Sequence, residues 1–148
     1  MNQSLICLLA AGLLASDVPR DQIQRDDLEQ LQGTWNVERI ELAGQVMPAN
    51  AVGEMRMVFE GNTLTMMMDK NTREKGRFAL VDGDPPGIDI EQPRGAGNQM
   101  MKGIYRLEDD TLTICSEEGG GRQNVRPKNF ETKGNDRVVL IVLKRVQK

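Results

Sequence analysis

The feature that most constrains the fold is a series of short runs in which apolar and polar residues alternate, joined by turns of very few residues. Met55, Met57 and Phe59 alternate with charged or smaller residues in one such run. Turns such as Glu60-Gly61-Asn62 and Glu108-Asp109-Asp110 join successive runs. Connections this short fit hairpins and cannot carry a parallel crossover. The sequence therefore predicts an antiparallel sheet with one buried face.

Eight runs meet this description, and we expect them to form a meander. They are Thr34 to Leu42, Glu54 to Phe59, Thr63 to Met68, Arg73 to Leu80, Gly87 to Glu91, Lys102 to Leu107, Thr111 to Ser116 and Arg137 to Arg145. An open sheet would expose two edges, whereas closure pairs the edge backbone groups and encloses the apolar face. The predicted fold is all-β, an eight-stranded antiparallel up-and-down barrel, with a two-sheet sandwich as the alternative.

One helix is expected, and it precedes the strands. Asp21 to Gln32 is rich in Asp, Glu, Gln and Leu, and Ile23, Leu28 and Leu31 can share one face. The last run is apolar on both faces from Val138 to Leu143, which indicates that its outer face is covered as well. We expect the helix to supply that cover.

The first sixteen residues have the pattern of a secretory signal. Residues 1–16 carry no charged side chain, and Leu5 to Ala15 are apolar apart from small residues. This stretch is shorter than the ~20 apolar residues that a membrane-spanning helix needs. We expect a signal peptide at residues 1–16, no stable membrane span, and one extracytoplasmic domain, periplasmic or secreted, at residues 17–148. A buried N-terminal helix or a retained anchor is the alternative.

Composition argues against several classes of function. Lys and Arg total 19 against 22 Asp and Glu, and no basic block is long enough for several phosphates, so a nucleic acid is not an expected partner. Histidine is absent, which removes the commonest proton shuttle and metal ligand. We expect no enzyme, no cofactor and no metal site, although carboxylates and Tyr105 leave acid–base chemistry as an alternative. Cys115 fits a small apolar strand residue.

Four segments, in order, carry a resemblance to a known family. They are Leu31-Gln32-Gly33-Thr34-Trp35, Gly103 to Cys115, Arg126 to Phe130, and Val139 to Arg145. The chain from Asp27 to Arg145 resembles the uncharacterised planctomycete lipocalin-like domain family. This resemblance implies a commonly secreted, lipocalin-like barrel of unknown function with no assigned catalytic residue. By similarity to lipocalins, Gly33 and Trp35 would close one end, with Arg145 or Lys144 over the indole ring.

Methionine is enriched, and it suggests what the interior holds. Nine Met accompany three Phe, one Trp and one Tyr. Flexible thioethers adapt to apolar guests of varied shape, so a hollow barrel would bind a small hydrophobic molecule, whereas a filled barrel would use the same side chains as its core. The expected lining is Met57, Phe59, Leu64, Met66, Phe78 and Leu80, with Tyr105 either a polar handle in the pocket or a half-exposed aromatic between strands.

Two longer connections suggest the alternative function, a solid-core interaction module of the cell envelope. Gln92 to Met101 and Glu117 to Pro127 are expected to be flexible loops that contact another protein. Arg126, Pro127 and Phe130 are expected to hold the segment before the last strand in place. In that interpretation Phe130 is buried and Arg126 donates hydrogen bonds to loop carbonyls.

Overall fold

The computed structural model describes residues 19–71, 73–94, 97–117 and 125–147, without the side chains of 92–98. The predicted signal peptide at residues 1–16 lies outside the described residues. The helices and strands of the described part are α1 (Arg20–Leu31), β1 (Gly33–Leu42), β2 (Gln45–Pro48), α2 (Ala49–Val52), β3 (Arg56–Glu60), β4 (Thr63–Met67), β5 (Arg73–Val81), β6 (Gly87–Arg94), β7 (Gly97–Glu108), β8 (Thr111–Glu117) and β9 (Val138–Arg145).

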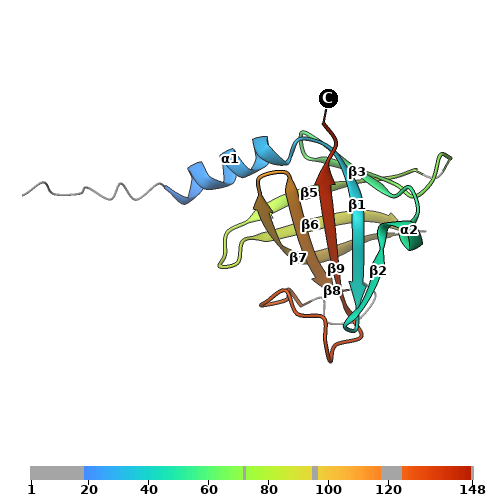
Figure 1. Cartoon of the computed structure of the whole chain (residues 1–148). Helices are drawn as coiled ribbons and strands as arrows, with labels where there is room; N and C mark the ends of the chain where they lie inside the picture. The colour runs from blue at the N-terminus through green and yellow to red at the C-terminus, as the bar shows by residue number, and fades with distance from the viewer. Residues whose placement is uncertain (1–18, 72, 95–96, 118–124, 148) are drawn as a thin grey trace, which may run out of the picture.

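The strands form a closed antiparallel barrel. Strands β3 to β9 follow one another in chain order, and β1 pairs with β3 on one side and β9 on the other. The closing seam runs from Trp35 opposite Arg145 to Leu42 opposite Val139, with an irregularity between Val37 and Arg39. Figure 1 shows β1 and β9 side by side along the length of the barrel. The prediction of an eight-stranded antiparallel up-and-down barrel is confirmed.

One strand, β2, lies outside the eight and was not predicted. It pairs with the second half of β1, whereas β3 pairs with the first half of the same strand. Ala43 and Gly44 both have positive φ, at 52° and 78°, so the chain reverses immediately after β1. All four residues of β2 are exposed, so no apolar alternation marks this strand in the sequence.

The inside of the barrel is filled at the end where α1 joins β1. Trp35 is fully buried, and its indole Nε1 donates a hydrogen bond of 2.9 Å to the carbonyl of Leu31. The rings of Phe59 and Phe78 meet edge to face, with 5.0 Å between their centres. The guanidinium of Arg145 lies 4.1 Å from the centre of the Trp35 ring.

A second, smaller core lies on the outer face of β7, β8 and β9. Ile104, Cys115, Val138 and Leu140 are buried there, and Phe130 packs against them. The outer face of β9 is therefore covered by the segment that precedes this strand. The prediction that α1 supplies this cover is wrong, because α1 contacts β5 at the end of the barrel. An apolar run indicates that both faces of a strand are buried, but it does not indicate which segment of the chain covers them.

The prediction of a flexible loop from Gln92 to Met101 is also wrong. Here β6 and β7 continue as a paired hairpin, with Glu91 opposite Met100 and Arg94 opposite Gly97. Pro93 interrupts the strand pattern in the sequence, so periodicity alone does not reveal the pairing. In the other predicted loop, Glu117 accepts a 2.9 Å hydrogen bond from the backbone of Val125. Residues 118–124 of that loop lie outside the described part.

Candidate functional site

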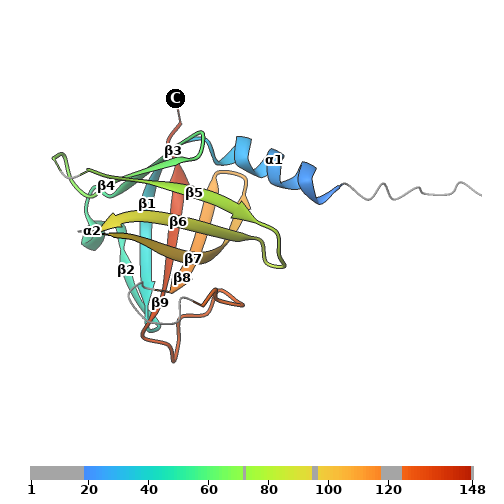
Figure 2. The ribbon, with the colours of Figure 1, turned by 180° about the vertical axis from the view of Figure 1, so that it is seen from behind.

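Helix α1 lies across one end of the barrel and is mostly polar. Figures 1 and 2 show that its C-terminal end lies at the rim where β9 ends and that its N-terminal end reaches beyond the barrel. Leu31 is its buried residue, while Ile23 is 49% exposed and Leu28 is 37% exposed. A helix that buries so little apolar surface depends on other contacts for its position.

The middle of α1 is held by two side-chain hydrogen bonds to the barrel. Gln24 Nε2 donates to Asp82 Oδ1 at 2.7 Å. The hydroxyl of Tyr105 on β7 donates to Asp27 Oδ2 at 2.5 Å. Both bonds join residues that lie far apart in the chain, so they fix the direction in which α1 leaves the barrel.

The C-terminal end of α1 is held more firmly. Gln32 makes two hydrogen bonds with the turn between β3 and β4, accepting from the amide of Gly61 at 2.6 Å and donating to its carbonyl at 3.1 Å. Arg145 donates to the carbonyl of Gln32 at 3.0 Å and to that of Gln30 at 2.5 Å. These bonds satisfy carbonyl groups that a helix end leaves without partners.

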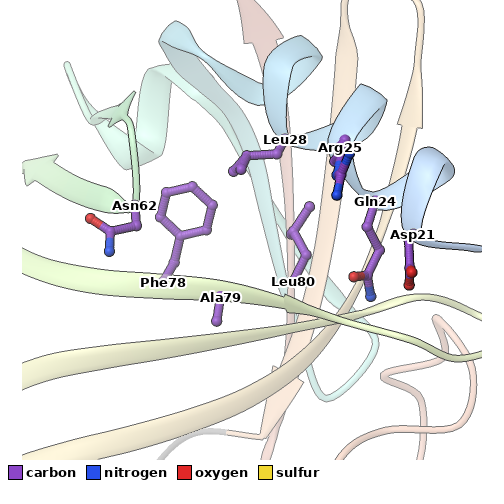
Figure 3. Close-up of a pocket in the computed structure, with 8 residues that line it drawn as sticks. All are labelled: Asp21, Gln24, Arg25, Leu28, Asn62, Phe78, Ala79 and Leu80. Atoms are coloured by element: carbon purple, nitrogen blue, oxygen red, sulfur yellow. The ribbon is translucent and has the colours of Figure 1, made fainter.

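An open pocket of about 470 Å³ lies between α1 and β5. In Figure 3, Phe78 and Leu80 project from β5 toward the helix, and Leu28 projects from the helix toward Phe78. Each of these three side chains is apolar, so they form the apolar wall of the site. The complete lining is Asp21, Gln24, Arg25, Leu28, Asn62, Phe78, Ala79 and Leu80.

The polar groups of this pocket come mainly from the helix. Asp21, Gln24 and Arg25 lie on the α1 side and Asn62 on the turn between β3 and β4. Among the described residues, Arg25 forms no ion pair. The site thus combines an apolar wall with a cation that is open to a ligand.

A second pocket, of about 340 Å³, lies on the other side of α1. It is bordered by Ile23 and Asp27 of the helix, the connection from β5 to β6, and Tyr105. Burial, followed by the hydrogen bond to Asp27, raises the pKa of Tyr105 far above its ordinary value. The phenol therefore stays protonated and acts as a hydrogen-bond donor. The complete lining of this second pocket is Arg20, Ile23, Gln24, Asp27, Val81, Asp82, Gly83, Asp84, Pro86 and Tyr105.

The residues predicted to line a hollow barrel fall into two groups. Met57, Phe59 and Leu64 are buried in the main core, and Met66 packs against it. Phe78 belongs to this core and Leu80 packs against it, yet both also line the pocket between α1 and β5. The sequence pattern identified the β5 wall of the pocket, which Phe78 and Leu80 form. On the helical wall it marked only Leu28, as part of the expected apolar face of the helix, because exposed polar helix residues give no signal of their own.

Tyr105 differs from the half-exposed aromatic that the sequence suggested. Its side chain is only 1% exposed, and its hydroxyl is committed to Asp27. Strand alternation places the ring inside the barrel, next to the core. The residue therefore reaches the second pocket as part of a buried contact between β7 and α1.

The residues expected to hold the segment before β9 contact the barrel wall. Arg126 donates to the carbonyl of Gly103 at 2.6 Å and forms an ion pair with Asp89 at 2.7 Å. The carbonyls that it binds belong to strands β6 and β7, and not to a loop as predicted. Phe130 is half-buried, with the guanidinium of Arg106 4.9 Å above its ring. Pro127 is half-buried in the same segment.

The fold and site together define an antiparallel β-barrel with a polar helix across one end and a pocket on either side of that helix. No family model, curated protein or solved structure matches the chain. In the described part, no helix is long and apolar enough to cross a membrane. The same residues contain no group of three or more His, Cys, Asp or Glu side chains arranged to hold a metal ion.

Proposed function

We propose that this protein is a non-enzymatic, extracytoplasmic binding protein that holds a small hydrophobic molecule between α1 and β5. The observation that carries the proposal is the pocket of about 470 Å³ with apolar side chains on both walls. Small-molecule sites commonly have this volume and combine apolar side chains with polar groups, and here apolar and polar residues each make up half of the lining. The extracytoplasmic location rests on the uncharged, apolar character of residues 1–16.

The chemistry of the lining defines the kind of ligand. Phe78, Leu80 and Leu28 would remove the apolar body of a ligand from water, which is the main source of affinity in such sites. Arg25 and Gln24 would meet its polar end. The best fit is an amphipathic molecule whose polar group stays at the helix edge and whose apolar part lies on β5.

Two observations support a binding role over catalysis. The chain has no histidine, so proton transfer near neutral pH would depend on carboxylates and one tyrosine. That tyrosine, Tyr105, is buried, and its hydroxyl donates a hydrogen bond to Asp27. The raised pKa of the phenol makes it a poor proton donor and leaves no phenolate to act as a base near neutral pH.

The test is a titration of the purified protein with a fluorescent fatty-acid probe, comparing two variants of α1. Leu28→Gln removes an apolar side chain from the pocket wall, and we expect it to weaken probe binding about tenfold, which is about 1.4 kcal/mol. Ile23→Gln is the matched control, because Ile23 lies on the other side of the helix and is also exposed. The control should bind the probe as the unmodified protein does.

Equal affinity of the two variants would place the ligand elsewhere. Absence of saturable binding, together with no small molecule released by organic solvent from the purified protein, would rule out the carrier function.

A further inference from the structure

Five cations gather on the outer face of the barrel, and none of them lines either pocket. Arg73, Lys75 and Arg77 alternate along β5 with residues that face inward, so all three side chains are exposed on the outside. Arg56 on β3 is also exposed, and Lys70 lies in the turn between β4 and β5. We call these five residues the basic face.

The strand register brings these cations together. Arg56 pairs with Met67 on β4, and Met67 pairs with Arg73 on β5. Arg56 and Arg73 therefore flank Met67 on the outer face, and two strand spacings separate them by about 10 Å. In Figure 2, β5 and β6 lie in front of β1 and β9, so the outer face of β5 is turned toward the reader.

The cations of the basic face lack close ion-pair partners among the described residues. None of its five residues forms an ion pair within the described part of the chain. Two glutamates lie at the Arg77 end of the face: Glu91 is opposite Arg77 on β6, and Glu60 is two strands away on β3. At the other end, Asp69 accepts a 2.7 Å hydrogen bond from the amide of Asn71. A chain with a net charge of −3 thus gathers five cations on one face, none of them in an ion pair with another described residue.

Apolar side chains lie among the cations. Met67 is half-buried between Arg56 and Arg73 on the outer face, and Met68, which begins the turn that also holds Lys70, is 39% exposed. Cations beside exposed and half-buried apolar side chains suit a membrane interface, where the charges meet anionic headgroups and the apolar groups enter the boundary with the acyl chains. A soluble polyanion would satisfy the charges and leave Met68 in water.

We propose that the basic face docks the barrel reversibly on a membrane surface rich in anionic lipid. Each Lys or Arg near such a surface strengthens binding about fivefold, so the whole face supports association without a membrane-spanning segment. Ala79 and Leu80 follow Arg77 on β5, which places the pocket below α1 at one end of this face. The docking surface and the pocket use different residues, and either can exist without the other.

The test is sedimentation of the purified protein with vesicles of phosphatidylcholine alone or mixed with phosphatidylglycerol. We expect binding to the mixed vesicles only, and we expect added salt to weaken it because the interaction is screened. The double variant Arg73→Gln with Lys75→Gln should bind the mixed vesicles about twenty-five-fold more weakly. Its control, Lys128→Gln with Lys133→Gln, loses the same charge from the segment before β9 and should bind normally.

A third variant separates a membrane from a soluble polyanion. Met68→Ser should weaken vesicle binding severalfold and leave binding to polyglutamate unchanged. Circular dichroism confirms that each variant is folded. Equal binding to both kinds of vesicle, full binding by the double variant, or binding to polyglutamate without binding to mixed vesicles would overturn the proposal.

Discussion

Arg145 lies 4.1 Å above the indole of Trp35, and the same guanidinium donates hydrogen bonds to two carbonyls at the end of α1. These contacts join the last strand, the first strand and the helix. We expect Arg145→Met to destabilise the protein by about 2–3 kcal/mol, since it removes a partly buried cation–π contact and leaves the helix carbonyls without a donor. Urea unfolding, followed by Trp35 fluorescence, measures the change.

The control is the other arginine that lies over an aromatic ring. Arg106 is 4.9 Å from the centre of the Phe130 ring, but half of its side chain is exposed and it bonds no helix end. Arg106→Met should cost less than about 1 kcal/mol. Equal losses in the two variants would contradict a special role for the Arg145 contact.

Replacing Tyr105 with Phe should loosen α1 while leaving the barrel intact. The variant keeps the ring in the core and removes the hydroxyl that donates to Asp27. We expect amide hydrogen exchange within α1 to become faster, with little change in β7 and β8. The loss of stability should be about 1–3 kcal/mol, because the lost bond goes to a carboxylate. Uniformly faster exchange over the whole chain would contradict this expectation.

The raised pKa of Tyr105 also predicts how stability changes with pH. A group whose pKa is higher in the folded state stabilises the protein fully below its unfolded pKa, about 10 for tyrosine, and this contribution falls as pH rises toward the folded value. The stability of the unmodified protein should therefore fall more steeply above pH ~10 than that of Tyr105→Phe.

The ultraviolet absorbance of tyrosinate provides a direct measurement, because the chain contains a single tyrosine. In the folded protein this absorbance should appear only as the protein unfolds in alkali. Tyrosinate absorbance near pH 10 without unfolding would show that Tyr105 is accessible to solvent.

Cys115 should be unreactive in the folded state. It is fully buried, and burial, with a smaller contribution from Glu41, raises the pKa of the thiol to about 11. Because the thiolate is the reactive form, a thiol reagent should modify Cys115 only when the protein unfolds. The measurement is the labelling rate against urea concentration, in a chain carrying Cys7→Ser so that one thiol is present. Rapid labelling without urea would contradict the prediction.

Gly87 and Arg126 should be energetically coupled. A Cβ atom on Gly87 would lie 2.6 Å from Arg126 Nη1, so Gly87→Ala must displace the guanidinium from Asp89 and the Gly103 carbonyl. We expect a loss of about 1–3 kcal/mol in Gly87→Ala. Adding Gly87→Ala to Arg126→Ala should then cost much less than it does alone, and urea unfolding of the four chains measures this. Additive losses would show that the two sites act independently.

The barrel could be predicted from the sequence because alternation and short turns are local signals that also determine the topology. Phe78 and Leu80 carry this signal, and both line the pocket below α1. The short strand β2 carries none, because its exposed residues Gln45 to Pro48 face solvent on both sides. Its place against β1 depends on the reversal at Ala43 and Gly44, which no periodicity reveals.

The position of α1 was beyond prediction for a different reason. Its contacts are single hydrogen bonds between distant residues, such as that of Gln24 with Asp82 and that of Asp27 with Tyr105. A glutamine or an aspartate on a polar helix looks the same in sequence whether or not a partner meets it in the fold. The helical wall of the site therefore becomes visible only in three dimensions.

The contact of Arg145 with Gln30 bridges residues 115 positions apart. Most of the polypeptide must therefore be in place before this bond can position the helix, and contacts of such long range form slowly. A nascent or partly folded chain would contain β5, but α1 would not yet lie over this strand. Ligand capture by this site would consequently report completed maturation of the protein.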